Sequence, residues 1–277
     1  MGAIREKFLA AAEAVKFEFF RLDRTYNNCN AEIFGGDTPA ERYFCPDCAA
    51  SLPFNDGYIC ARCGRSALEP CESCDACSTS DSQIKYARSS FYYAYPVDKA
   101  VKDLKFSGKK YLAEVYAHFL KDTYLKYFSG ADAFAFSPMT RRSERRRGYN
   151  QAERLARELT KLVGVPTLDV LVKSRETEVQ SRLGKAERSV NLKNAIKAGN
   201  RALIEGKRIV FIDDIMTSGA TAEACAEQLM KAGASEVCVL TLATVTDKAV
   251  AGRLGQRSNS WVKGNSLRDI FFRTYEE

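Results

Sequence analysis

The sequence predicts an α/β protein, in which a mostly parallel central sheet is flanked by helices and preceded by a small zinc-ribbon-like module. Strand and helix patterns alternate over residues 84–247, and helices between strands favour a parallel sheet. Eight of the ten cysteines fall between Cys29 and Cys77, which favours a bound metal over dispersed thiols. A hydrophobic strand pattern also runs into the acid pair Asp213 and Asp214, which indicates a ligand site.

Composition and charge limit the classes of function that the chain can have. The chain has 277 residues and a formal net charge of +7, which suits phosphate-bearing partners without separating a metabolite from nucleic acid. The single histidine, His118, excludes mechanisms that need a histidine pair and metal sites rich in histidine. No apolar run is long enough to span a membrane, and the charged N-terminal stretch does not resemble a signal peptide. We therefore expect a cytoplasmic protein.

Four segments are expected along the chain. They are an N-terminal helix over residues 1–27, a Cys-rich zinc-ribbon-like domain over 28–80, the α/β domain over 84–247 and a C-terminal tail over 248–277. The tail is polar and has no clear pattern.

Local patterns predict the elements of the α/β domain. Strand composition occurs over residues 89–95, 133–137, 209–213 and 236–243. Apolar residues at helical spacing predict helices over residues 111–128, 150–164 and 220–233. The residues expected on the buried faces of the first two helices are Leu112, Val115, Tyr116, Phe119, Leu120, Ala152, Leu155, Leu159 and Leu162.

The stretch RIVFIDDIMTSGAT, residues 208–221, joins a strand, an acid pair and a hydroxyl-rich loop. Ligands of α/β sheets bind beyond the carboxyl ends of the strands, where Asp213 and Asp214 are expected. The following helix begins with free N–H groups that suit a phosphate, and Gly219 allows close approach of the backbone. The acids repel phosphate but accept hydrogen bonds from sugar hydroxyls, so the pattern predicts a ribose 5-phosphate unit.

Three other interpretations of the acid pair are weaker. A Walker B strand requires a P-loop, and no G-x-x-x-x-G-K-[ST] pattern occurs in the chain. A receiver-type phosphoacceptor pair lies near the start of its domain, whereas only 63 residues follow Asp214. A purely structural strand end would leave two adjacent acids without ligands, which is costly.

The stretch VFIDDIMTSGAT resembles the phosphoribosyl pyrophosphate (PRPP) motif of the type I phosphoribosyltransferases. The resemblance implies the type I phosphoribosyltransferase fold for residues 84–247. It implies that Asp213 and Asp214 are the catalytic pair that holds the ribose hydroxyls, with Mg²⁺ bridging the pyrophosphate and ribose oxygens. The PRPP-binding residues that it implies are Ile212, Ile215, Met216, Thr217, Ser218, Gly219, Ala220 and Thr221.

A basic stretch, residues 137–156, carries five arginines between Arg141 and Arg147. Because it follows a strand and precedes a helix, we expect it at the ligand-facing edge of the sheet rather than as a solvated basic run. Guanidinium groups bind phosphate oxygens, so the stretch fits a pyrophosphate or a nucleic-acid backbone equally well. The residues expected to bind PRPP from this stretch are Arg141, Arg145, Arg146 and Arg147.

Three segments resemble the ComF family, the competence-associated branch of the phosphoribosyltransferases. They are LKFSGKKYLA (104–113), RRGYNQAE (146–153) and TEVQSRLGKAERSVNLKNAI (177–196). In type I phosphoribosyltransferases a flexible loop closes over the site and excludes water, and the resemblance implies this role for residues 173–196. The functional members of the loop that it implies are Gln180, Arg188 and Asn191.

The cysteines predict structural zinc. Three Cys-x-x-Cys pairs, each typical of a zinc knuckle, occur at Cys45 and Cys48, Cys60 and Cys63, and Cys71 and Cys74. A reducing compartment disfavours the alternatives, a redox dithiol and a disulfide cluster. Cys225 and Cys238 lie in helix and strand patterns and are expected to be ordinary buried residues.

The resemblance also bears on which cysteines share a metal. The ComF family commonly begins with a double zinc ribbon of four such pairs, and here the first pair is broken, with Cys29 alone. Ribbon order then implies one intact site formed by Cys60, Cys63, Cys71 and Cys74. Cys45 and Cys48 would form a degraded or three-thiolate site with Cys29, and pairing of Cys45 and Cys48 with Cys60 and Cys63 stays an open alternative.

The hypothesis that follows is a ComF-like phosphoribosyltransferase. It would bind PRPP and Mg²⁺ and transfer the phosphoribosyl group to an unknown nitrogenous acceptor, with release of pyrophosphate and a link to competence and DNA uptake. The alternative is a non-enzymatic scaffold with the PRPP fold, or a competence accessory protein that binds single-stranded DNA. The partners considered are PRPP, the acceptor, single-stranded DNA, the competence machinery and a second copy of the chain in a homodimer.

Overall fold

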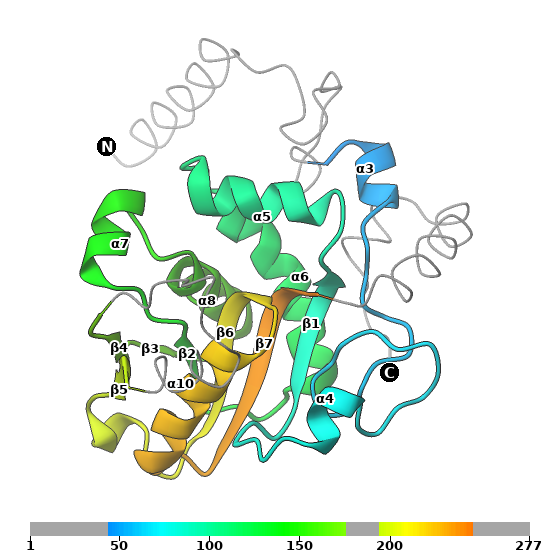
Figure 1. The fold of residues 1–277 in the computed structure, drawn as a ribbon. Helices are drawn as coiled ribbons and strands as arrows, with labels where there is room; N and C mark the ends of the chain where they lie inside the picture. The colour runs from blue at the N-terminus through cyan, green and yellow to red at the C-terminus, as the bar shows by residue number, and fades with distance from the viewer. Residues whose placement is uncertain (1–43, 176–193, 246–277) are drawn as a thin grey trace, which may run out of the picture. The chain divides into compact units, whose positions relative to one another are not determined.

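The computed structural model describes residues 44–175 and 194–245, and Figure 1 labels their helices and strands. The chain divides into two compact units, residues 1–50 and residues 51–277. The second unit contains both the sheet and the cysteines from Cys60 to Cys77.

The described part of the first unit is short. It contains helix α3 (Pro46–Ala50), and the N–H group of Cys48 donates a hydrogen bond to Cys45 Sγ at 3.3 Å, as in a zinc knuckle. Cys29, the N-terminal helix expected over residues 1–27 and the tail expected over residues 248–277 lie outside the described residues.

The second unit is built on a parallel sheet of five strands, as the alternating patterns predict (Figure 1). In spatial order the strands are β1 (Ala87–Tyr92), β7 (Glu236–Thr244), β6 (Arg208–Met216), β2 (Ala133–Phe136) and β3 (Thr167–Leu168). β7 is apolar along most of its length because both faces of the sheet are covered. A separate antiparallel pair consists of β4 (Leu171–Lys173) and β5 (Ile196–Ala198).

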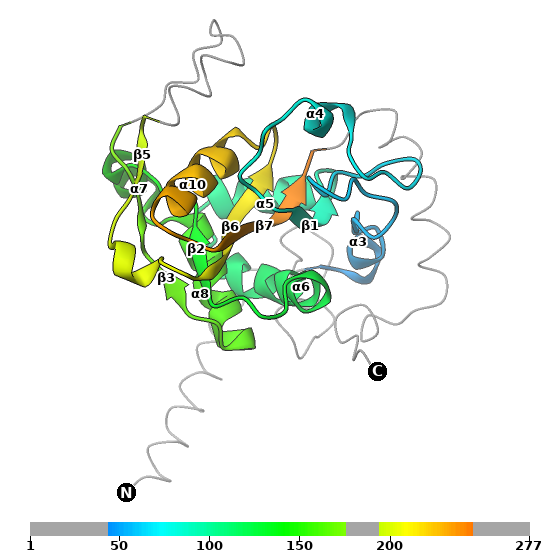
Figure 2. The same cartoon turned by 90° about the horizontal axis from the view of Figure 1, so that it is seen from below.

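Helices cover both faces of the sheet (Figure 2). α6 (Leu112–Tyr127) and α8 (Gln151–Val163) pack together on one face, and α10 (Ala220–Lys231) packs on the other with β5. The apolar faces predicted for α6 and α8 are buried, except that Leu162 is 36% exposed because it lies in the last turn of α8. Among the helices in the described ranges, none has the length and apolar character that a membrane span needs.

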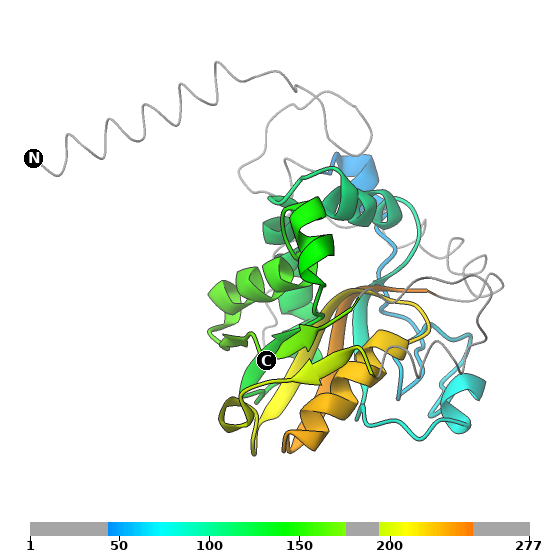
Figure 3. The same ribbon diagram turned by 60° about the vertical axis from the view of Figure 1, so that its left-hand side comes forward.

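Two short helices lie beyond the carboxyl ends of the strands (Figure 3). α5 (Val97–Phe106) follows β1, and α7 (Arg141–Arg147) contains the arginine run. The run is helical because Thr140 caps its first turn, accepting a hydrogen bond from Ser143 N–H at 3.2 Å, and Gly148 ends it at φ 85°. The sequence pattern does not predict this helix. Two further short helices are α4 (Asp75–Ser78) and the 3₁₀ turn η1 (Arg201–Leu203).

The strand that carries the acid pair is longer than its hydrophobic pattern. The sequence predicts this strand over residues 209–213, but β6 continues to Met216 because Ile215 and Met216 still pair with Ala243 and Thr244 of β7. The acids therefore lie inside the strand, three and two residues before its end, rather than beyond it.

Candidate functional site

A cavity of about 280 Å³ opens where β6 gives way to α10, at the carboxyl edge of the parallel sheet. This edge is where α/β proteins bind ligands. Its lining residues are Asp213, Ile215, Met216, Thr217, Ser218, Gly219, Ala220, Thr221, Ala222 and Thr241. The structure thus brings together Asp213 and the whole loop that the sequence singles out, and it adds Thr241 from β7.

The loop has the geometry of an anion site. Gly219 precedes α10 with φ 82°, a left-handed conformation that glycine adopts readily. Because glycine has no side chain, this residue cannot cap the helix with a side-chain hydrogen bond. The first N–H groups of α10 have no partner within the helix and carry its positive dipole end. The exposed hydroxyl groups of Thr217 and Ser218 flank them. The arrangement can therefore bind a phosphate through backbone and hydroxyl donors.

The two acids face different surroundings because successive residues of a strand point to opposite faces of the sheet. Asp213 lines the cavity, and its Oδ1 accepts a hydrogen bond from the N–H of Asp214 at 2.8 Å. Asp214 is buried and pairs with Lys105 of α5, with 2.9 Å between Nζ and Oδ1. Its Oδ2 is buried and has no hydrogen-bond partner within the described ranges, so one acceptor stays available.

Asp213 should give the folded protein a distinctive pH dependence. Burial and then the charge of Asp214 raise the pKa of Asp213 to about 7. Because the unfolded chain has the ordinary value of 3.8, the folded protein favours the protonated acid. The stability that this group contributes is full below the unfolded pKa and is lost as the pH rises through about 7.

We expect Asp213→Asn to remove this contribution, since an amide does not titrate. Urea unfolding from about pH 5.5 to about pH 8 should show the wild type losing more stability than the variant over that range. Equal pH slopes in the two proteins would contradict the assignment.

The arginines lie apart from this cavity. Arg141, Arg145 and Arg146 are exposed, Arg147 is half-buried, and none of the four lines it. Ile212, also expected to bind PRPP, is fully buried and does not line it either. Gln180, Arg188 and Asn191 fall outside the described residues, between β4 and β5.

The segment around Tyr149 and Asn150 orders the elements next to the site. The Tyr149 hydroxyl donates a hydrogen bond to the Leu104 carbonyl of α5. The Asn150 side chain caps α8, accepting hydrogen bonds from the first-turn N–H groups, and donates to Ser137 O at 2.9 Å. These contacts join α5, α8 and the end of β2, and they give the RRGYNQAE segment a structural role.

A second constellation is a cluster of four cysteines, Cys60, Cys63, Cys74 and Cys77, whose Sγ atoms all lie within 4.8 Å of one another. Sulfur atoms around a tetrahedral Zn²⁺ are about 3.8 Å apart, given Zn–S bonds of about 2.3 Å. The 3.7 Å between Cys63 Sγ and Cys74 Sγ matches that edge. The cluster is therefore compatible with structural zinc.

The cluster shares three cysteines with the set that ribbon order implies, and it holds Cys77 in place of Cys71. Cys71 lies beside Cys60 through its backbone, since its carbonyl accepts a hydrogen bond from Ala61 N–H at 2.8 Å. The turn of α4, which starts at Asp75, carries Cys77 back toward Cys74. Spacing in the sequence does not reveal that turn.

The surroundings of Cys60 favour its thiolate, whereas burial raises the pKa of Cys63 and raises that of Cys77 to about 11. Desolvation raises the pKa of Cys60, but backbone hydrogen bonds at Cys63, Cys74 and Arg62 outweigh it and bring the pKa down to about 6. One of these bonds runs from Cys74 N–H to Cys60 Sγ at 3.3 Å. A thiolate is the form that binds a metal ion.

Comparisons with known proteins relate this chain to a family and to several relatives. A family model described as a phosphoribosyl transferase domain matches residues 145–271. DNA utilization protein YhgH of Salmonella typhimurium is 28% identical over 66% of this chain and 83% of its own length. Competence protein ComFC of Streptococcus pneumoniae is 30% identical over 72% of this chain and 86% of its own length. A solved structure, glutamine PRPP amidotransferase from B. subtilis, aligns at 20% identity and a TM-score of 0.38, over 51% of this chain and 30% of its own.

Proposed function

Because this chain belongs to the ComF family of the phosphoribosyltransferase superfamily, we propose that it binds PRPP with Mg²⁺ and transfers the phosphoribosyl group. The acceptor would be a nitrogenous compound, and pyrophosphate would leave. The observation that carries the proposal is the cavity in which Asp213, the loop hydroxyl groups and the first turn of α10 meet.

The ribose and the 5-phosphate of PRPP each have a counterpart in this cavity. The 5-phosphate would take the N–H groups and hydroxyls from Thr217 to Thr221, at the positive end of α10. The ribose hydroxyls would donate hydrogen bonds to Asp213, and Asp214, which is buried on the opposite face of the strand, would act on the sugar through its negative charge. Holding both ends of the ribose phosphate fixes the anomeric carbon relative to the leaving group and the acceptor.

The chain supplies chemistry suited to this transfer. The bond from the anomeric carbon to pyrophosphate would break as the bond to the acceptor nitrogen forms, through a state resembling an oxocarbenium ion. Negative charge on Asp213 and Asp214 favours the positive charge that develops on the sugar. The oxygen donors present are those that Mg²⁺ prefers, and Mg²⁺ would supply charge compensation for the pyrophosphate.

Calorimetric titration with PRPP and Mg²⁺ tests the binding step. We expect the wild type to bind and Asp213→Asn with Asp214→Asn to abolish the heat, since the double variant removes both carboxylates. Asp132→Asn is the matched control, because Asp132 precedes β2 at the opposite edge of the sheet and accepts a hydrogen bond from Arg208 N–H. Pyrophosphate release in a screen of nitrogenous acceptors then tests turnover. A wild type that gives no heat would rule out the proposal.

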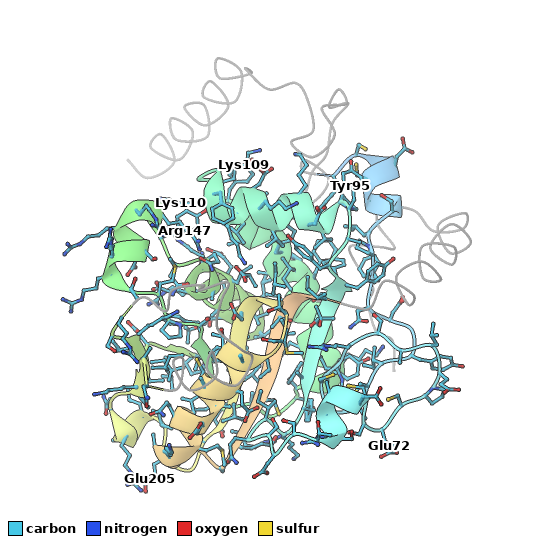
Figure 4. The ribbon with its side chains drawn as sticks, viewed as in Figure 1. Glu72, Tyr95, Lys109, Lys110, Arg147 and Glu205 are labelled. Atoms are coloured by element: carbon cyan, nitrogen blue, oxygen red, sulfur yellow. The ribbon has the colours of Figure 1, made fainter. Side chains whose placement is uncertain are left out.

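A second candidate function is binding of single-stranded DNA. Phe106 at the end of α5 is 74% exposed, and the Arg147 guanidinium lies 5.3 Å from its ring centroid. Lys110 lies over the Tyr149 ring, and Figure 4 shows Lys109, Lys110 and Arg147 where α5 approaches α7. An exposed ring among basic side chains, such as that of Phe106, is typical of sites that stack bases and contact phosphates.

The same titrations separate the two functions. An oligothymidylate whose affinity falls steeply with salt, together with no heat from PRPP, would favour the DNA-binding scaffold. Heat from PRPP that depends on the two carboxylates favours the enzyme. The names DNA utilization protein and competence protein, carried by the relatives, are in keeping with a role linked to DNA uptake under either function.

A further inference from the structure

The Cys-rich segment contacts the loop of the cavity directly. Arg65 Nη2 donates a hydrogen bond of 2.5 Å to the carbonyl oxygen of Thr217, a residue 152 positions later in the chain. Thr217 lines the cavity, whereas Arg65 does not. The guanidinium group therefore holds the loop from its outer side.

Arg65 is part of the zinc knuckle. Its carbonyl accepts a hydrogen bond from Cys60 N–H at 2.9 Å, and the intervening Gly64 donates to Cys60 O at 2.9 Å. Gly64 has φ +69°, and a Cβ there would lie 2.3 Å from the Ala87 carbonyl oxygen of β1, so only glycine fits. Asn55 Nδ2 also donates to Gly64 O at 2.7 Å. The backbone that carries Arg65 is thus held both by the cysteine cluster and by the sheet.

A second contact reaches the helix after the loop. Glu223 lies in the first turn of α10 and accepts hydrogen bonds from Ser82 Oγ at 2.6 Å and from Gln83 N–H at 2.7 Å. Ser82 and Gln83 belong to the segment that leaves the cysteine cluster and enters β1. The Cys-rich segment therefore contacts the loop at Thr217, and the segment that follows it contacts the first turn of α10 at Glu223.

We propose that Arg65 is a positioning residue that couples the zinc site to the phosphate loop, an inference that rests on the proposed binding of PRPP. In a trans peptide the C=O of Thr217 and the N–H of Ser218 point in opposite directions. Holding the Thr217 carbonyl outward, toward Arg65, keeps the Ser218 N–H directed toward the cavity. Loss of zinc would release the backbone that carries Arg65. The Ser218 N–H would then no longer be held in the direction of the cavity.

The coupling works in both directions. If the zinc site orders the loop for PRPP, then PRPP must strengthen retention of zinc by the same factor, because the coupling free energy is shared. An arginine of the knuckle that touched the ligand itself would show the same reciprocity. Faster hydrogen exchange of the ligand-free loop when Arg65 is replaced is the result that marks a positioning role, because a group that acts only on the ligand leaves the ligand-free loop unchanged.

Four zinc-loaded full-length proteins test the proposal: the wild type, Arg65→Gln, Arg65→Lys and Arg62→Gln. Arg62 is the matched control because it lies in the same knuckle but donates to Cys77 O at 2.7 Å and Ser80 O at 3.3 Å, away from the loop. We expect Arg65→Gln to weaken PRPP–Mg²⁺ binding about ten-fold, Arg65→Lys to recover part of the loss, and Arg62→Gln to change it less than about two-fold.

Two further measurements give readouts other than affinity. PRPP–Mg²⁺ should slow zinc transfer to a chromogenic chelator in the wild type but not in Arg65→Gln. In the ligand-free proteins, hydrogen exchange of the amides from Ser218 to Thr221 should be faster in Arg65→Gln, and in zinc-free wild type, than in zinc-loaded wild type or Arg62→Gln.

The outcomes separate this inference from the function that it deepens. No heat from PRPP in the wild type overturns the proposed function, and the exchange of the ligand-free loop still decides whether Arg65 positions it. Loop exchange in Arg65→Gln equal to that of the wild type overturns the inference, as does an equal loss of affinity in Arg62→Gln and Arg65→Gln.

Discussion

Lys105→Met is expected to lower the free energy of unfolding by about 3 kcal/mol, because breaking a buried ion pair leaves its partner charged and unpaired. The partner is Asp214, whose side chain is 4% exposed and lies 2.9 Å from Lys105 Nζ. Asp213 stands next to it and adds a second carboxylate to the same region. Urea unfolding followed by circular dichroism measures the loss.

Two variants show whether the loss comes from the buried charge. Adding Asp214→Asn to Lys105→Met should restore most of the stability, since a neutral amide in that place needs no counter-charge. Lys102→Met is the matched control in the same helix: Lys102 pairs with Asp98 at 3.0 Å, but its side chain is 58% exposed and its loss should be small. A Lys105→Met protein as stable as Lys102→Met would show that the pair does not carry the stability of the site.

Cys77→Ser is expected to remove the zinc of the four-cysteine cluster, whereas Cys71→Ser should keep it. The Cys77 Sγ lies within the four-sulfur cluster, and the Cys71 Sγ is outside it. Small zinc sites contribute about 10 kcal/mol or more of binding free energy to the folding of their segment, so the effect should be large. Metal analysis gives the zinc content, and hydrogen exchange over residues 55–80 reports whether the segment stays folded.

The two cysteine variants also decide between ribbon order and the observed cluster. Zinc lost from Cys71→Ser and kept in Cys77→Ser would support the set Cys60, Cys63, Cys71 and Cys74 that the family pattern implies. Removal of zinc from the wild type with a chelator should give the same hydrogen exchange over residues 55–80 as the variant that has lost its zinc.

Much of the fold can be predicted from the sequence because the patterns that indicate each helix and strand lie in consecutive residues. The apolar spacing of Leu112, Val115 and Tyr116 predicts a buried helix face, and all three are buried in α6. The stretch from Arg208 to Thr221 likewise carries its strand, loop and helix start in consecutive residues, so the cavity could be located before any coordinates. The helix formed by the arginine run was not predicted, because it depends on the cap at Thr140 and the basic composition of the run does not indicate a helix.

The partners of the site residues were beyond sequence reasoning. Lys105 belongs to a segment whose resemblance to a family pattern is visible, yet nothing near it in the chain indicates Asp214 as its partner. Pairing along β6 places both acids inside a strand, and the alternation of a strand then turns them to opposite faces. A hydrophobic pattern that ends at the acids could not show this.

By itself the sequence determined the class of fold, the place of the loop from Thr217 to Thr221 that lines the cavity and the presence of a cysteine cluster, since each depends on neighbours in the chain. Only the tertiary structure decided that Cys77 joins the cluster, that Lys105 pairs with Asp214 and that Arg65 holds Thr217. Each of the last two contacts joins residues more than a hundred positions apart, and packing of the sheet and its helices, rather than any local pattern, brings them together.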